Sequence, residues 1–168
     1  MKPARSVRVR DPGERVRELV GRERFSDAQV RRLGPGAVQR LIEVFQTASG
    51  DLADRQRRKA LHALGVLGTD EAVDFLIATA DNDEVEGWLQ RAAVRSLGLA
   101  RQPRAIAYLT SLLEKPDLGD RDNAIMALGY SDDPQATRAL QQAVASEPDE
   151  RLRQRARRSL SQAERDRG

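Results

Sequence analysis

The sequence has no cysteine, which excludes disulfide bonds, thiolate metal sites and cysteine nucleophiles. This absence is typical of proteins kept in a reducing compartment, so we expect a cytoplasmic protein. The chain also lacks an apolar run long enough to cross a membrane, and no apolar stretch follows the basic start MKPARSVRVR, as it would in a secretory signal. The sequence therefore favours a soluble, unexported protein without membrane partners.

Aromatic residues are scarce as well, at 4% of the 168 residues, although 39% are hydrophobic. The core must therefore be built from alanine, leucine, valine and isoleucine, which suit closely packed helices better than a β-sandwich. A chain of this length is one domain and buries most of its apolar surface without a metal or a disulfide.

Charge is unevenly distributed along the chain. Residues 1–33 carry ten basic and five acidic side chains, residues 34–146 twelve and sixteen, and residues 147–168 seven and five. The basic ends are compatible with anionic partners, whereas the acidic middle disfavours a uniform nucleic-acid binder.

One six-residue pattern recurs four times at offsets of 33, 31 and 32 residues. It reads ALHALG at 60–65, AVRSLG at 93–98, AIMALG at 124–129 and ARRSLS at 156–161. A second pattern keeps the same period upstream of each copy, and its first residues are Ala37, Ala72, Ala105 and Ala136. Two patterns with one period indicate a structural repeat.

Each repeat is predicted to be a pair of helices. The first helix opens after aspartate or proline, as at Asp70 and Pro103. The second helix ends in the first three units on Gly65, Gly98 and Gly129, for which we expect left-handed C-terminal caps. One pair cannot cover its own apolar face, so the pairs must stack. We predict an all-α protein, an α-solenoid of about four pairs at 35–65, 70–98, 103–129 and 134–164.

The ends of the chain are predicted to close this stack. Residues 1–11 are expected to be a disordered basic tail, residues 12–34 a helical cap, and residues 165–168 a C-terminal tail. Ser26 and Gln29 have the spacing of a capping box. In the last unit Ser161 replaces the glycine and Arg157 stands at a usually apolar position, which is typical of a terminal repeat.

The motif A-V-x-x-L-I followed by A-x-x-A-L-G resembles the HEAT-like repeats of the phycobilisome lyase type, over about residues 36–160. The resemblance implies the fold and leaves the function open, because scaffolds, bilin lyases, alkylpurine DNA glycosylases and deoxyhypusine hydroxylases all have such repeats. The single histidine lacks the His-Glu pairs of the hydroxylases, and the single tryptophan is too few for a glycosylase. We expect no catalytic residue, metal or cofactor.

The resemblance also implies that the second helices line a concave surface. The candidate partner-binding residues on it are Arg58, Lys59, His62, Trp88, Arg91, Arg95, Asn123, Met126, Arg155 and Arg158, and Arg31, Asp122 and Gln154 extend the same surface. Arginine suits carboxylate and phosphate contacts. The preferred hypothesis is therefore a scaffold for an acidic protein partner, and the alternative is nucleic-acid binding.

Two explanations without a binding role stay open beside these hypotheses. Exposed arginines are often merely solvated, and Asp54 is placed to neutralise Arg58. Trp88 is either a binding anchor or a packing residue against Leu118 or the next loop.

Overall fold

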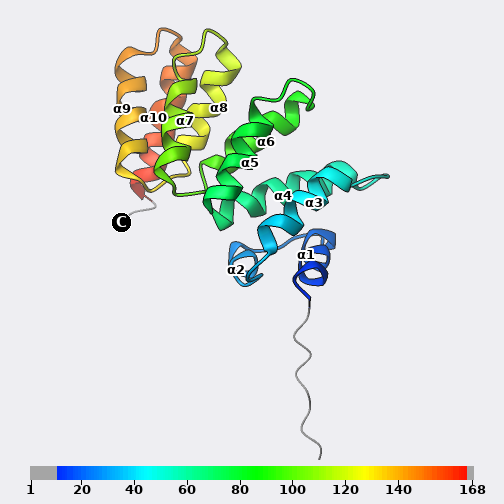
Figure 1. Ribbon diagram of the computed structural model, residues 1–168. Helices are drawn as coiled ribbons and strands as arrows, with labels where there is room; N and C mark the ends of the chain where they lie inside the picture. The colour runs from blue at the N-terminus through cyan, green and yellow to red at the C-terminus, as the bar shows by residue number, and fades with distance from the viewer. Residues whose placement is uncertain (1–10, 166–168) are drawn as a thin grey trace, which may run out of the picture.

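The computed structural model describes residues 11–165, and within this range the chain forms ten α-helices and no strand (Figure 1). This confirms the all-α prediction. The helices are α1 (Pro12–Gly21), α2 (Asp27–Arg31), α3 (Ala37–Thr47), α4 (Ala53–Leu67), α5 (Asp70–Ala80), α6 (Gly87–Leu97), α7 (Pro103–Leu112), α8 (Leu118–Leu128), α9 (Pro134–Ser146) and α10 (Glu150–Arg165).

The predicted tails fall almost wholly outside the described residues: of 1–11 only Asp11 is described, as the N-cap of α1, and of 165–168 only Arg165, the last residue of α10. Among the described helices none has the length and apolar composition that crossing a membrane requires.

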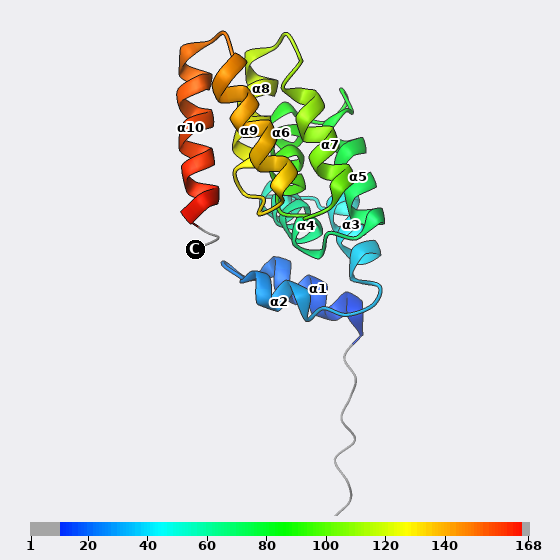
Figure 2. The ribbon, with the colours of Figure 1, turned by 90° about the vertical axis from the view of Figure 1, so that its left-hand side faces the viewer.

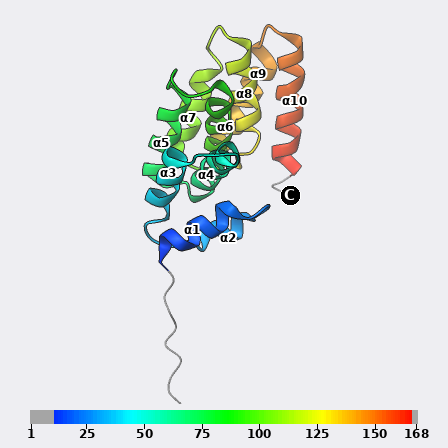
Figure 3. The same cartoon turned by 90° about the vertical axis from the view of Figure 1, so that its right-hand side faces the viewer.

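The helices pack in sequential pairs, α3 with α4, α5 with α6, α7 with α8 and α9 with α10. Successive pairs turn gradually, so that α3 and α4 lie almost across the direction of α9 and α10 (Figure 1). From α3 onward the even-numbered helices pack closely along the stack, whereas the odd-numbered helices touch their odd-numbered neighbours only lightly. The even-numbered side is therefore the more tightly packed side of the stack. We call α2, α4, α6, α8 and α10 the inner row (Figures 2 and 3).

The expected left-handed caps at the repeat glycines are wrong. Gly65 lies inside α4, and the left-handed residue that ends this helix is Gly68, with φ of 57°. Gly98 and Gly129 do cap α6 and α8, but their φ values of −62° and −66° are right-handed. Backbone conformation is therefore not what requires glycine at the repeat positions.

Close approach along the inner row requires it instead. A Cβ atom on Gly65 would lie 2.3 Å from the carbonyl oxygen of Ser96, and one on Gly98 would lie 2.1 Å from the carbonyl oxygen of Ala127. Each of these contacts joins an inner helix to the next one. Ser161 holds the equivalent position in α10, against which no further described helix packs, so a side chain is tolerated there.

The core is a continuous layer of small and medium apolar side chains. At the repeat positions the alanines and leucines are fully buried except for Leu160 in the last repeat, which is partly buried, and the buried ones are Ala60, Leu64, Ala93, Leu97, Ala124, Leu128 and Ala156. Short side chains allow neighbouring helices to interdigitate tightly. The scarcity of aromatics is thus explained by the packing of the stack.

The segment before the first pair covers its open face. Val16 and Val30 are fully buried, because α1 packs on α3 and α4 and α2 packs on α4. The predicted capping box is confirmed, since the amide of Gln29 donates to Ser26 Oγ at 3.4 Å and the amide of Ser26 donates to Gln29 Oε1 at 2.8 Å.

Candidate functional site

The candidate residues occupy equivalent positions on neighbouring helices of the inner row. Arg58 of α4 corresponds to Arg91 of α6, and His62 corresponds to Arg95, 33 residues later in each case. Neighbouring packed helices lie about 8 to 10 Å apart. Arg58, Arg91 and Arg95 are all exposed. The inner row therefore presents a ladder of guanidinium groups between α4 and α6.

These guanidinium groups have no acidic partner. Arg58, Arg91 and Arg95 make no hydrogen bond and no ion pair within 4.0 Å in the described part of the chain, and the half-buried Arg55 makes none either. The considered pair between Asp54 and Arg58 does not form. Their donors remain available for another molecule.

Lys59 contacts the N-terminal helical segment and is not part of the free basic surface. Its ammonium donates to the carbonyl oxygen of Val20 at 3.1 Å and to that of Arg22. Desolvation lowers the pKa of Lys59, and the charges of Arg55 and Arg58 lower it further. Lys59 thus fixes the end of α1 and the loop after it.

His62 has a similar structural role. Its Nε2 atom lies 3.1 Å from Asp27 Oδ1, and its ring packs against Phe25 with the centroids 5.7 Å apart. The ammonium of Lys59 stands over the same Phe25 ring, 5.8 Å from its centroid. The two α4 side chains together hold α2 and its preceding loop onto the first pair.

The candidate residues on α8 and α10 are largely paired or buried. Arg155 Nε lies 2.6 Å from Asp122 Oδ1, and its Nη1 donates to the sulfur of Met126 at 3.1 Å. Asp122 Oδ1 is buried and has no well-directed hydrogen bond, so this ion pair is what compensates its charge. The expectation that Asn123 points outward is wrong: it is buried and donates to the carbonyl oxygen of Gly119 at 2.8 Å.

Two outlying candidates, Arg31 at the end of α2 and Arg158 on α10, are exposed and make no ion pair within the described residues. Both lie on helices at the ends of the inner row. Among the candidate residues, the free guanidinium groups are therefore those on α4 and α6, with one more at either end of the row.

A second ladder of long polar side chains was missed in the sequence. One position on each of α4, α6, α8 and α10 donates to the backbone carbonyls at the end of the preceding outer helix or loop. The donors are Arg57 to Phe45 and Ala48, Gln90 to Asn82, Arg121 to Lys115 and Pro116, and Arg153 to Glu147. Their spacing follows the repeat period, so the signal was present. These side chains tie each unit together and are not free for binding.

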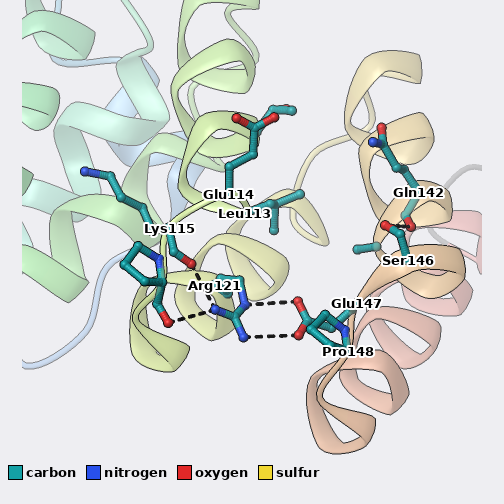
Figure 4. Close-up of a pocket in the computed structure, with 11 residues that line it drawn as sticks. Leu113, Glu114, Lys115, Arg121, Gln142, Ser146, Glu147 and Pro148 are labelled. Atoms are coloured by element: carbon teal, nitrogen blue, oxygen red, sulfur yellow. Dashed lines mark hydrogen bonds and ion pairs between the residues drawn. The ribbon is translucent and has the colours of Figure 1, made fainter.

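Arg121 goes further and joins two units (Figure 4). Its Nε and Nη2 donate to the two carboxylate oxygens of Glu147 at 3.1 and 3.2 Å. The side chains are only 12% and 5% exposed. The pair lies beside a pocket of about 350 Å³ between the loops that precede α8 and α10. A buried bidentate pair here locks the last two units together.

Trp88 lies on the same face of α6 as Arg91, Ala92 and Arg95, at helical spacings of three, four and seven residues. The side chain is half-buried and packs against the core. Its indole N–H donates to no group in the described part of the chain and is open to solvent. Trp88 is thus partly a packing residue and partly an available surface.

A carboxylate-lined cleft of about 330 Å³ adjoins this face between α6 and α8. Its charged lining consists of Arg91 and Lys115 together with the carboxylates of Asp81, Asp83, Asp117 and Asp120, so acidic side chains outnumber basic ones beside Arg91. Within residues 11–165 no group of histidine, aspartate and glutamate side chains is placed to hold a metal ion.

Residues 86–161 match a family model described as HEAT repeats. Over this segment, which runs from the start of α6 into α10, the chain is similar to HEAT repeats. No curated protein matches the chain. HEAT repeats generally act as protein-interaction scaffolds and are usually non-catalytic. The HEAT-repeat segment contains Trp88, Arg91 and Arg95, whereas Arg58 precedes it.

Proposed function

We propose that the protein is a non-catalytic, cytoplasmic interaction module whose inner row binds an acidic segment of another protein. The binding surface consists of Arg55 and Arg58 on α4 and Trp88, Arg91 and Arg95 on α6. The observation that carries the proposal is the lack of any carboxylate partner for these arginines in the described residues. Arginine forms bidentate hydrogen bonds with carboxylates, and its planar group loses little freedom in doing so.

The confined shape of the basic surface favours a protein segment over a nucleic acid. Toward α8 the ladder ends in the neutralised pair of Asp122 and Arg155. Beside Arg91 the carboxylates of Asp83 and Asp120 line the adjoining cleft. A long phosphate backbone crossing the inner row would meet these carboxylates, whereas a short acidic segment fits between them. The resemblance of the repeats to the phycobilisome lyase type gives no reason to propose a particular ligand.

The proposal is tested with a fluorescent glutamate-rich peptide and anisotropy titrations at low salt. Arg95→Glu should weaken binding about tenfold, because it removes an attraction and adds a repulsion. Arg138→Glu is the matched control, since Arg138 is an exposed, unpaired arginine on the outer helix α9 and the net charge changes equally. Equal losses for the two variants would show that only net charge matters and would overturn the proposal.

A second arm replaces the peptide with a single-stranded oligonucleotide of the same length. Tighter binding of the oligonucleotide, impaired by Arg95→Glu and falling by about 0.7 log unit per phosphate for each log unit of salt, would establish nucleic-acid binding in its place.

A further inference from the structure

We propose that the acidic partner segment carries an apolar side chain between its carboxylates, and that this side chain packs on Trp88 and Ala92 of α6. The inference rests on the proposed function, because it concerns the same surface. It adds a specificity element that charge alone does not supply.

The first observation is the position of these two residues. Trp88 and Ala92 are four residues apart on α6, both half-buried, and so form one short apolar strip about 6 Å long. Arg91 and Arg95 lie beside the strip on the same helix. An apolar contact surface next to free guanidinium groups matches a segment in which an apolar side chain lies between carboxylates.

The second observation is that only α6 has this strip among the second helices of the four pairs. The positions equivalent to Trp88 and Ala92 are polar or lack a side chain in the other three. They are Arg55 and Lys59 on α4, Gly119 and Asn123 on α8, and Arg151 and Arg155 on α10. The strip is therefore not a requirement of the repeat, although both side chains also pack in part against the core.

The third observation is the free edge of the indole. Trp88 Nε1 donates to no group in the described residues and is open to solvent. Tryptophan usually uses this N–H when its environment closes around it. A partner seated on the strip supplies the missing acceptor from a carboxylate or a backbone carbonyl. Half-buried tryptophans beside arginines are the residue types that dominate binding energy at protein interfaces.

Two synthetic peptides test the inference on the full-length protein. One has a central leucine between two runs of glutamate, and the other has serine in place of that leucine. The leucine peptide should bind about tenfold more tightly, because burial of an aliphatic side chain is worth at least that factor. Trp88 is the only tryptophan, so its emission should shift to shorter wavelength with the leucine peptide alone.

The variants locate the effect. Trp88→Ala should abolish the difference between the two peptides, whereas Tyr130→Ala, which removes an aromatic side chain that is 54% exposed outside this surface, should preserve it. Arg95→Glu should weaken both peptides. If circular dichroism shows that the Trp88→Ala variant is unfolded, the Ala92→Glu variant is used in its place. This change leaves Trp88 intact and should also abolish the preference for the leucine peptide.

The outcomes separate this inference from the proposed function. Equal binding of both peptides by the wild type, or a leucine preference that survives Trp88→Ala or Ala92→Glu, would overturn the inference and leave the acidic-segment function standing. If neither peptide binds the wild-type protein, both this inference and the proposed function are overturned.

Discussion

The arginine side chains of the two halves of the stack differ in whether they form ion pairs with carboxylates. From the loop before α7 to α10 most arginines in the described chain have a carboxylate partner: Arg101, Arg104, Arg121, Arg151, Arg153, Arg155 and Arg157. From α1 to α6 most have none: Arg15, Arg17, Arg24, Arg31, Arg32, Arg55, Arg57, Arg58, Arg91 and Arg95, of which Arg57 donates to backbone carbonyls instead. Arg22 and Arg40 are the paired exceptions in the first half. In the second half Arg138, Arg158 and Arg165 have no carboxylate partner among the described residues.

The difference teaches that the role of a charged residue is set by what the fold places beside it. A guanidinium already paired with a carboxylate has little left to offer a partner. An unpaired one keeps all its donors but contributes little to stability. In the second half, the ion pairs of Arg101, Arg104, Arg121 and Arg155 join different units. In the first half, the unpaired arginines are the ones that the proposed function assigns to recognition.

The largest expected effect lies at the junction of the two halves, where Gly98 of α6 meets α8. Gly98→Ala should lower the free energy of unfolding by about 3 kcal/mol, because the new methyl group would overlap the carbonyl oxygen of Ala127 and two packed helices must separate. Urea unfolding followed by circular dichroism measures the change.

Ser161→Ala is the matched control, since it occupies the same repeat position without a following described helix. It should change stability by less than about 0.5 kcal/mol. Equal effects of the two substitutions would mean that close approach is not the reason for the glycine.

The next largest effect should come from the paired half. Arg121→Ala should cost about 2 kcal/mol, because it leaves the buried carboxylate of Glu147 without its cation and frees the carbonyls of Lys115 and Pro116. Arg58→Ala in the unpaired half should cost less than about 0.5 kcal/mol under the same conditions. Comparable losses of unfolding free energy in the two variants would mean that paired and unpaired arginines contribute equally to stability.

The repeat architecture could be predicted because it depends on local patterns. The recurrence of alanine and leucine at one period indicated which faces are buried, and the spacing of Ser26 and Gln29 indicated a helix start. Each of these signals lies within a few residues of the structure it predicts. The glycines at 65, 98 and 129 were recognised as special, but their role depends on a neighbouring helix about thirty residues away.

The candidate site was harder to predict because ion pairing joins distant positions. Arg121 and Glu147 are 26 residues apart, and Lys59 reaches Val20 near the end of α1 across 39 residues. Helical register placed Arg58, Arg91 and Arg95 on the inner row, but only the packed structure distinguishes them from Arg155. For the same reason Asn123 was expected on the surface and is buried.

A third prediction concerns a contact between neighbouring units, the hydrogen bond from Tyr108 on α7 to Asp81 after α5, at 2.6 Å. Burial raises the pKa of Tyr108, and the hydrogen bond and charge of Asp81 raise it further. Folding thus favours the protonated phenol, so its contribution is complete below the unfolded pKa of about 10 and is lost as pH rises through the folded value.

Tyr108→Phe should therefore cost about 1 kcal/mol at neutral pH. The gap between wild type and variant should narrow above pH ~10, where the unfolded tyrosine ionises. Unfolding titrations from neutral to alkaline pH measure both curves. A gap that stays constant over this range would contradict the assigned pKa direction.

The smallest effect should come from giving the unpaired half an ion pair of its own. Arg91→Glu places a carboxylate four residues before Arg95 on α6, the orientation in which such pairs stabilise helices by about 0.3 to 0.5 kcal/mol. Arg91→Gln removes the same arginine without supplying the pair and is the control. If pairing decides the role of arginine, Arg91→Glu should be slightly more stable than Arg91→Gln and should bind the glutamate-rich peptide several-fold less tightly. Equal peptide affinities for the two variants would mean that Arg95 recognises nothing through its free donors.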